Sequence, residues 1–475
     1  MSLIHILLWS LFSLVTGWLF PARWRVWILL VASLLALFVL QTSSPIRSLD
    51  FWLPLISIGL TLLVWGITVP IDRGNRLSNL LVFALIAGVI LVISLTRYLG
   101  DFCCLTPSRP PQLLPVIAAV GLALCPAYLI SRSNAAGRYL SWLAILIILA
   151  LFIILKSPPI GLATSMVLRS LNSQDVSLAG HLDLAWLGFS YLAFRLLHVL
   201  RDFQSDRLPA FSAGEFVTYV LFYPSLTAGP IDRSQRFIQN DLRKAPTVNP
   251  SDRLLAGERI LIGVFKKFVI ADALALVALS PQNSLQVGSS LWLWMLLYAY
   301  SLRLFFDFSG YIDVALGIAM LVGIRLPENF NRPYLKTNLT AFWNSWNITL
   351  AQWFRAYVFN PLTRGMRASS RQYPVWLVIL TGQTITMLLL GLWHGISWNY
   401  AIWGLWHAAG LFIHNRWSDW IRPRLGNAET NRPARIGLAL GGWFLTFQFV
   451  TLGWVWFALP DVQTAIRVFE KLFGF

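Results

Sequence analysis

Long apolar runs are the feature that most restricts how this chain can fold. Stretches of roughly twenty residues with few or no charged side chains recur along most of the sequence. Hydrophobic residues make up 57% of the chain and charged residues only 12%, which is more apolar surface than a soluble core can bury. Because a bilayer offers backbone groups no water, such runs must be helical. The sequence therefore predicts an all-α, polytopic integral membrane protein.

The apolar runs also set the expected limits of the membrane helices. Candidate spans lie near residues 2–20, 24–40, 51–70, 78–98, 113–131, 139–155, 183–200, 213–228, 255–280, 290–323, 374–393, 397–413 and 436–458. We expect roughly 11–13 transmembrane helices. Residues 255–280 and 290–323 are too long, or too polar within, for simple crossings, so we expect breaks, tilts or re-entrant segments there.

The basic residues indicate membrane orientation. A formal net charge of +17 would favour nucleic acid as the partner of a soluble domain. Here Arg and Lys lie mostly between the apolar runs, so membrane lipid is the expected partner and nucleic acid is not. Basic residues at every second connection place residues 73–76, 132–138 and 201–206 in the cytoplasm and the N-terminus outside. The first apolar segment has no basic start and no cleavage site, so we expect it to be a retained span.

Up to about residue 180 the sequence has few candidate catalytic or ligand-binding residues. Its spans are rich in Leu, Ile and Val, and residues 156–180 are typical of an external loop with a short interfacial helix. No cluster of Cys, His and carboxylates has the spacing of metal ligands, and no glycine-rich loop has the spacing that holds phosphate. We therefore expect a scaffold here, and neither a bound metal nor a nucleotide-binding fold in the chain.

Polar residues become frequent after residue 180. Residues 189–203, FSYLAFRLLHVLRDF, carry Arg195, His198, Arg201 and Asp202 near the end of a span. Snorkelling cations and an ion pair are favoured over catalysis there. Residues 222–237, FYPSLTAGPIDRSQRF, contain two prolines and a glycine and cannot remain a regular helix. Broken backbone at membrane depth survives only inside protein or beside a water-filled cavity.

Two lysines and two aspartates occupy otherwise apolar segments. Lys266 and Lys267 fall in one candidate span, and Asp307 and Asp313 fall in the segment FFDFSGYIDVALG. Intramembrane carboxylates are candidates for a functional site, but pairing with these lysines or with Arg303 explains them equally well.

The most informative stretch runs from residue 339 to residue 414. We expect LTAFWNSWNITLAQWFRAYVF, residues 339–359, to form one helix, because its apolar side chains repeat at helical spacing, and Asn347 falls on the same inward stripe. The stripe comprises Trp343, Trp346, Leu350, Phe354 and Tyr357. Farther on, His394 stands in the segment GLWHGISWNYAIWGLWHAAG, where an imidazole needs a hydrogen bond or a function. On one continuous helix His407 would lie about 20 Å from His394, although Gly395 and Ser397 could break that helix.

Six motifs in a fixed order resemble a known family. They are YPSLTAGPIDRSQRF, FFDFSGYIDVALG, LPENFNRPYL, FWNSWNITLAQWFRAYVF, GLWHGISWNYAIWGLWHAAG and FVTLGWVWFAL. Together they resemble the membrane-bound O-acyltransferase family, within it the bacterial branch of alginate O-acetylation and teichoic-acid D-alanylation proteins. The resemblance covers about residues 185–460. We therefore expect scaffold helices at 1–180, a catalytic core at 181–460 and a short amphipathic tail at 461–475.

The resemblance implies a ring of helices around a membrane funnel and assigns roles to particular residues. The family's invariant histidine falls on His394, which becomes the expected general base, since imidazole has a suitable pKa. Its second polar position falls on Asn347, whose amide is expected to stabilise the carbonyl oxygen or orient the acceptor. The bacterial branch usually has His at this position, so Asn347 departs from it. His407 resembles a recurrent histidine of the same branch.

Supporting residues and substrates complete the expectations. Around the catalytic pair we expect His407, Asp307, Trp346 and Trp393 as supporting side chains. The favoured function is transfer of an acyl group, in the first place acetyl, from a thioester to a hydroxyl of a cell-envelope polysaccharide. Acyl-CoA or an acyl-carrier protein would be the donor, a periplasmic acyltransferase a possible partner, and the bacterial inner membrane the location. A lipid or protein acyltransferase, which Asn347 favours, is the alternative; a transporter is the third, although no internal repeat supports it.

Overall fold

The structure, a computed structural model, describes residues 2–68, 76–100, 103–131, 137–244, 247–425 and 432–474. Helices dominate these residues, and the β contact found among them is an isolated bridge between Phe330 and Trp346. The predicted all-α class is therefore confirmed. Seven of the described helices are long and apolar enough to cross a membrane, so the chain is a multi-pass membrane protein. These are Leu49–Thr68, Leu77–Tyr98, Leu113–Ser131, Gly137–Lys156, Ser290–Leu321, Val375–His394 and Arg432–Ala458.

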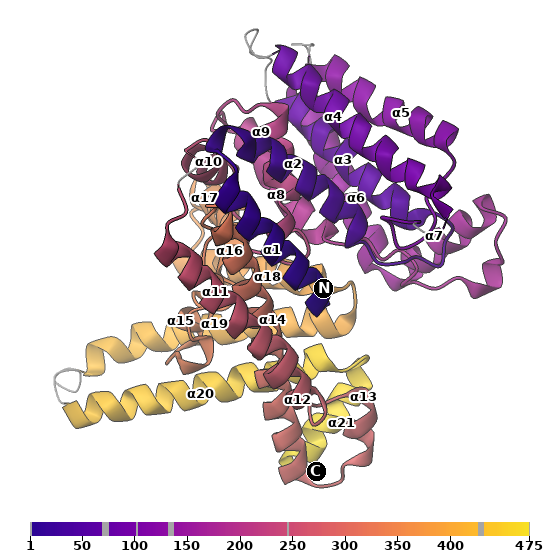
Figure 1. The fold of residues 1–475 in the computed structure, drawn as a ribbon. Coiled ribbons are helices and arrows are strands. Elements are labelled where there is room, and N and C mark those ends of the chain that lie inside the picture. Colours follow the sequence, from indigo (N-terminus) through magenta and orange to yellow (C-terminus); the bar gives the residue numbers. More distant parts are fainter. Residues whose placement is uncertain are drawn as a thin grey trace. The chain divides into compact units, whose positions relative to one another are not determined.

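The chain divides into two compact units. Figure 1 shows the fold with colours that follow the sequence from the N-terminus to the C-terminus. One unit comprises Met1–Ile260 with Val314–Pro327, and the other comprises Leu261–Asp313 with Glu328–Phe475. Of the connections predicted to be cytoplasmic, residues 69–75 and 132–136 lie outside the described residues. The side of the membrane on which each connection lies stays a prediction.

The first unit holds the helices of the N-terminal half. They are α1 (Leu3–Leu19), α2 (Ala22–Val39), α3 (Leu49–Thr68), α4 (Arg76–Leu95), α5 (Leu113–Ser131), α6 (Gly137–Lys156), α7 (Pro158–Leu171), α8 (Phe189–Gln204), α9 (Ala213–Leu221), α10 (Ser234–Arg236) and most of α11 (Pro250–Phe265). Short 3₁₀ turns lie at Thr96–Tyr98, Val176–Leu178 and Tyr223–Ser225, and a π-helix lies at Phe237–Leu242. Helix α3 packs against α5, because Gly66 lets the two backbones approach closely: a Cβ there would lie 2.6 Å from the Ala127 carbonyl oxygen.

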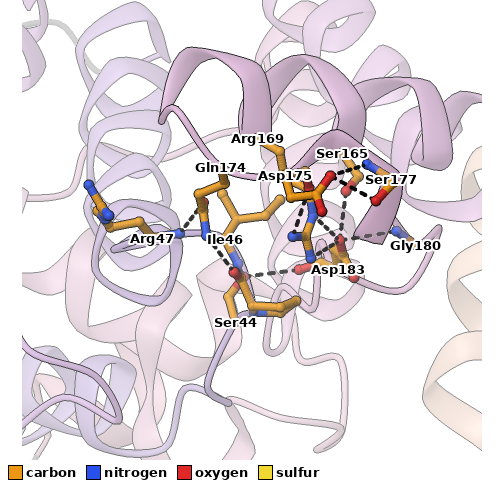
Figure 2. A network of polar contacts seen from close by, with 11 residues as sticks. Ser44, Ile46, Arg47, Ser165, Arg169, Gln174, Asp175, Ser177, Gly180 and Asp183 are labelled. Atoms are coloured by element: carbon orange, nitrogen blue, oxygen red, sulfur yellow. Dashed lines mark hydrogen bonds and ion pairs between the residues drawn. The ribbon is translucent and has the colours of Figure 1, made fainter.

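A polar network secures the segment that follows α7 (Figure 2). Arg169 and Asp183 form an ion pair at 2.9 Å, and their side chains are only 6% and 12% exposed. The same carboxylate accepts hydrogen bonds from the Ser165 hydroxyl at 2.7 Å and from the Gly180 N–H at 3.1 Å. Burial alone would raise the pKa of Asp183, but these hydrogen bonds and the Arg169 guanidinium outweigh it and lower the pKa.

Gln174 joins this network to the connection between α2 and α3. Its Oε1 accepts from the Arg47 N–H at 2.9 Å, and its Nε2 donates to the Pro45 carbonyl at 3.0 Å. The Ser44 hydroxyl donates to the Asp183 carbonyl at 3.1 Å. Residues 156–180 thus contain the predicted short helix, α7, and specific polar contacts hold the segment that follows it.

Residues 222–237 break from helical geometry, as predicted. Arg195 donates hydrogen bonds to carbonyls that have no helical partner near this break. Its guanidinium donates to the carbonyls of Val220 at 2.7 Å and Ser225 at 2.9 Å, and to the Ser225 hydroxyl at 2.7 Å. Arg195 is 2% exposed. The prediction of a snorkelling arginine is therefore wrong for this residue, because the carbonyls left by the broken helix provide its partners inside the protein.

The second unit holds the remaining elements. They are a π-helix at Lys266–Ala271, α12 (Asp272–Ala275), α13 (Pro281–Gln286), most of α14 (Ser290–Leu321), α15 (Leu339–Trp343), α16 (Ile348–Phe354), a π-helix at Arg355–Phe359, α17 (Asn360–Arg367), α18 (Val375–His394), α19 (Trp398–Leu425), α20 (Arg432–Ala458) and α21 (Val462–Phe473), with a 3₁₀ turn at Pro333–Leu335. Figure 1 shows α19 and α20 as two long neighbouring helices. Within 255–280 the helix changes to π geometry at Lys266–Ala271 and ends at Ala275, whereas 290–323 contains one continuous helix of 32 residues.

Candidate functional site

His394 ends a helix of a tightly packed pair. Helix α18 ends at this residue, and α19 begins at Trp398 after a short turn. Two glycines allow the helices to approach closely: a Cβ on Gly391 would lie 2.2 Å from the Tyr400 carbonyl oxygen, and one on Gly404 would lie 2.4 Å from that of Met387. The chain therefore turns back directly after His394, and this imidazole lies at the end of its helix.

Aromatic rings surround the half-buried His394. Its ring centroid lies 4.4 Å from that of Trp393, 4.8 Å from Phe457 and 5.4 Å from Trp403. The Trp403 contact is edge-to-face, with the planes at 87°. Tyr400 lies 5.9 Å away on the other helix of the pair. These rings fix the orientation of the imidazole and limit the access of water to it.

His407 belongs to the same aromatic cluster. Its centroid lies 5.0 Å from Trp403, 5.1 Å from Trp343 and 5.8 Å from Phe449. The side chain is fully buried, and neither ring nitrogen has a hydrogen-bond partner among the described residues. Because the chain turns after His394, both histidines contact Trp403. On one continuous helix they would lie about 20 Å apart.

Asn347 lies at a break in the helix expected over residues 339–359. Helix α15 ends at Trp343 and α16 begins at Ile348, so the expectation of one continuous helix is wrong. Asn347 precedes α16 in the left-handed region, at φ 42°, which asparagine adopts more readily than most residues. The apolar stripe is nevertheless buried at Trp343, Trp346, Leu350 and Phe354.

Hydrogen bonds fix which end of the Asn347 amide is a donor. The Asn329 Oδ1 accepts from the Thr349 N–H at 2.9 Å and from the Thr349 hydroxyl at 2.8 Å. The Asn329 Nδ2 must therefore donate, and it does so to the Asn347 Oδ1 at 3.0 Å. The Asn347 Nδ2 is consequently the end that faces away from Asn329. This arrangement presents a fixed N–H donor on a side chain that is only 6% exposed.

A cavity of about 160 Å³ lies between the segment that starts with α16 and helix α18. Its lining includes Trp343, Ala351, Arg355, Gln383, Met387 and Leu390. Ala351 lies one helical turn after Asn347, and Leu390 lies one turn before His394. Arg355 is exposed, and its guanidinium is held by the Asn344 side-chain oxygen at 2.5 Å.

The direction of the two lining segments places the catalytic candidates toward the same end of the segment pair, although neither candidate is among the residues that line the cavity. Gly382 packs against Phe359 and Thr363, where a Cβ would lie 2.8 Å from either side chain. The early part of α18 therefore lies beside the later part of the α16–α17 segment, and the two run antiparallel. Asn347, at the start of one segment, and His394, at the end of the other, consequently lie toward the same end.

The supporting residues expected from the sequence divide into two groups. Trp393 contacts His394, and the Trp346 ring lies 5.4 Å from Trp454, which lies 5.9 Å from Trp403 in the same cluster. Asp307 instead forms an ion pair with Lys267. Lys266 and Asp313 pair at 2.6 Å. The paired interpretation of these charges therefore holds, and Asp307 is not among the residues in ring contact with the histidines.

Sequence reasoning missed the polar lining of the cavity. Trp343 was expected only as part of the buried stripe, and Gln383 and Arg355 were not singled out. Gln383 lies within an apolar span, where an amide needs a partner, and this signal was present in the sequence. Arg355 lies in a π-helix, an element frequent at functional sites, but its occurrence is not visible from local periodicity.

Comparisons with known proteins agree with this architecture. The family model described as MBOAT, membrane-bound O-acyltransferase family, matches residues 135–454. A probable alginate O-acetylase of Pseudomonas aeruginosa is 34% identical over 291 residues, which are 61% of this chain and 52% of that protein. A teichoic acid D-alanyltransferase of Bacillus subtilis is 31% identical, over 58% of this chain and 70% of that protein.

A third relative comes from another polymer system. A peptidoglycan O-acetyltransferase of Helicobacter pylori is 34% identical over 56% of this chain and 48% of that protein. The chain spans about half the length of the alginate and peptidoglycan relatives it matches. The family model alone covers well over half of the chain. This chain belongs to the membrane-bound O-acyltransferase family.

Proposed function

We propose that this protein transfers an acyl group, in the first place acetyl, from a thioester to a hydroxyl of a cell-envelope polysaccharide. Family membership and relatives named for alginate, teichoic acid and peptidoglycan support this function. The observation that supports it is that the segment beginning at Asn347 and the helix ending at His394 pack antiparallel and line one cavity. A base and a fixed donor are the two groups that direct acyl transfer requires.

His394 acts as the general base in the proposed reaction. A ring nitrogen takes the proton of the acceptor hydroxyl as its oxygen attacks the thioester carbonyl. The Asn347 Nδ2 donates to the oxygen on which negative charge develops, an effect on the order of 3 kcal/mol for a well-placed donor. The carbon–sulfur bond then breaks, and the imidazolium returns the proton to the leaving thiolate. No covalent enzyme intermediate is needed.

The thioester donor enters through the cavity. A slender chain fits a volume of about 160 Å³, and Leu390 in the cavity lining lies one helical turn before His394. Arg355 at its lining is exposed and suited to a phosphate, which both acyl-CoA and the arm of an acyl-carrier protein carry. The acceptor polymer and a periplasmic acyltransferase partner meet the enzyme on the other face of the bacterial inner membrane.

Asn347 favours a second candidate, a lipid or protein acyltransferase, because the polysaccharide-modifying branch usually has His there. A transporter is less well supported. The charges that suggested it, Lys266, Lys267, Asp307 and Asp313, pair with one another in the structure and need no transported ion to balance them.

Reconstitution of the purified protein tests the proposal. Donors carrying a labelled acetyl group, acetyl-CoA and an acetylated carrier protein, are offered with alginate, peptidoglycan fragments, a lipid alcohol or a peptide as acceptor. We expect label on a polysaccharide hydroxyl, and none with the His394→Ala variant. Label on the lipid or peptide alone would favour the second candidate. No transfer from either donor to any acceptor, by a protein that melts cooperatively, would contradict acyl transfer.

A further inference from the structure

Two residues that line the cavity each have a buried polar atom without a partner among the described residues. The Trp343 Nε1–H is a donor, and the Gln383 Oε1 is an acceptor; neither has a hydrogen bond among the described residues. Trp343 is 6% exposed. A buried polar atom left unpaired is costly, and such atoms are uncommon in native proteins. Both atoms therefore require an explanation, and both belong to residues that line the same cavity.

The polar atoms define what a ligand must offer. An occupant must present an acceptor to the Trp343 N–H and a donor to the Gln383 oxygen. The lining also includes apolar side chains that suit methylene groups, Phe354, Met387 and Leu390 among them, beside the polar Thr340, Thr386 and Asn415. A chain in which secondary amides alternate with short methylene segments meets all three requirements. A simple alkyl thioester meets only the apolar one.

The two atoms lie at different depths. Trp343 contacts Trp403, the ring that also contacts His394, so its indole lies toward the reacting end. Gln383 lies eleven residues before His394 on α18, about 16 Å along the helix axis. An amide close to the thioester therefore meets Trp343, and an amide farther along the arm meets Gln383.

We propose that Trp343 and Gln383 are specificity residues for the donor: Trp343 donates to the inner amide carbonyl of the donor arm, and Gln383 accepts from its outer amide N–H. The inference rests on the proposed function, since it assumes that the cavity admits the donor. It assigns the recognition of the donor to two residues outside the catalytic pair. A donor whose thiol carries no amide would bind without these two hydrogen bonds and leave both atoms unpaired.

Three acetyl donors test the assignment one amide at a time. S-Pentyl thioacetate has no amide, S-acetyl-N-acetylcysteamine has the inner amide, and S-acetylpantetheine has both. For the wild-type protein we expect kcat/KM to rise about tenfold with each added amide. Trp343→Phe should abolish the preference for S-acetyl-N-acetylcysteamine over S-pentyl thioacetate. Gln383→Leu should keep that step and abolish the preference for S-acetylpantetheine.

A matched control separates the cavity from a general effect of indole loss. The Trp456 Nε1 is also buried without a partner among the described residues, but Trp456 is not among the lining residues of the cavity. Trp456→Phe should therefore keep both preferences. Equal preferences in wild type, Trp343→Phe and Gln383→Leu would overturn the inference while leaving acyl transfer intact. No transfer from any of the three donors by wild type would overturn the proposed function and this inference together.

Discussion

Two regions of this chain bury polar side chains in opposite ways. Around Asp183 every strong polar group has a partner: Arg169, Ser165 and Gly180 all donate to one carboxylate (Figure 2). Around the cavity and the aromatic cluster, the Trp343 N–H, the Gln383 oxygen and both nitrogens of His407 have none among the described residues. Both regions are buried, so exposure does not explain the difference.

The difference separates groups that maintain the fold from groups that meet a substrate. A satisfied network stabilises one conformation of the chain, and removing a member leaves its partners buried and unpaired. An unsatisfied group destabilises the empty protein and gains only when a substrate supplies the missing partner. Changes near Asp183 should therefore lower stability, whereas changes around the cavity should lower turnover.

The largest expected effect is at His394. His394→Ala should lower acyl transfer by at least about a hundredfold, because the general base is lost. The melting temperature in detergent should stay close to that of wild type, since the imidazole is half-buried and most of the aromatic cluster remains. Transfer of labelled acetyl by the two purified proteins measures the effect. Near-normal turnover by the variant would remove His394 from the reaction.

Asn347 gives the next largest effect, and its backbone determines the choice of variant. Leu would be strained at φ 42°, so its failure would not report on the amide. Asn347→Asp keeps the size and still accepts from Asn329, but it offers no donor when ionised. Turnover per folded molecule should fall by about a hundredfold, and the melting temperature should fall as well, because an ionised carboxylate is costly at this buried position. Asn347→His, which retains an N–H, should keep part of the activity.

An active Asn347→Asp protein would assign Asn347 to the fold rather than to the reaction. The measurement is turnover of both variants with one thioester donor, beside thermal melts of each. If the Asp variant matches wild type while the His variant fails, the Asn329 contact is the function of this side chain, and His394 works with another partner.

The outcome at Asn347 shows what local periodicity reveals and what it does not. Helical spacing correctly predicted that most of the stripe is buried, because burial follows the direction of the side chains around an axis. Tyr357, at the end of the stripe, is only partly buried. It did not predict the break before Ile348. The break depends on Asn329, whose backbone and side chain bind residues 347–349, and no local pattern reports a contact across that separation.

The same distinction between chain-wide patterns and contacts between distant segments applies to composition and to the charged residues. Composition predicted an all-α membrane protein correctly because chain-wide hydropathy decides it. The pairing of Lys266 with Asp313 remained open, since it requires two segments to meet. Arg195 was assigned wrongly to the membrane surface because its acceptors, the Val220 and Ser225 carbonyls, arise only where the helix after it breaks. The cavity, which five separate elements line, had no sequence signal as a whole.

A change in the polar network around Asp183 should lower the stability of the protein and leave turnover unchanged. Arg169→Met keeps much of the side-chain volume but leaves the Asp183 carboxylate without its cation, so we expect a loss of about 3 to 5 kcal/mol in the free energy of unfolding. Turnover per folded molecule should be unchanged. Chemical denaturation in detergent and the acetyl-transfer assay measure the two quantities. A stable variant with impaired turnover would break the comparison between the two regions.

A change at His407, whose ring nitrogens have no partner among the described residues, should raise stability and lower turnover. His407→Phe replaces an unpaired imidazole by a ring suited to its aromatic neighbours, so we expect stability to rise by about 1 kcal/mol and turnover to fall. His198→Phe is the matched control: His198 is equally buried but lies 3.4 Å from the Tyr219 and Ser234 hydroxyls. That variant should be destabilised. A less stable His407→Phe protein would show that the imidazole has an unseen partner.

The smallest expected effect is the acid dependence of the Asp183 network. Its hydrogen bonds and the Arg169 guanidinium lower the pKa of Asp183 despite burial, which acts in the opposite direction. A carboxylate with a lowered pKa in the folded state contributes stability at pH values above its unfolded pKa of about 3.9, and this contribution is lost as the pH falls through the folded value. Wild type should therefore be more stable than Asp183→Asn near neutral pH, and the gap should narrow below about pH 4. Asp419→Asn is the control, because Asp419 is 64% exposed in its pair with Arg416 and should show little gap at any pH. Thermal melts of the three proteins across this pH range measure these differences. A stability difference between wild type and Asp183→Asn that stays constant into acid would mean that the ionised carboxylate is not what stabilises the network.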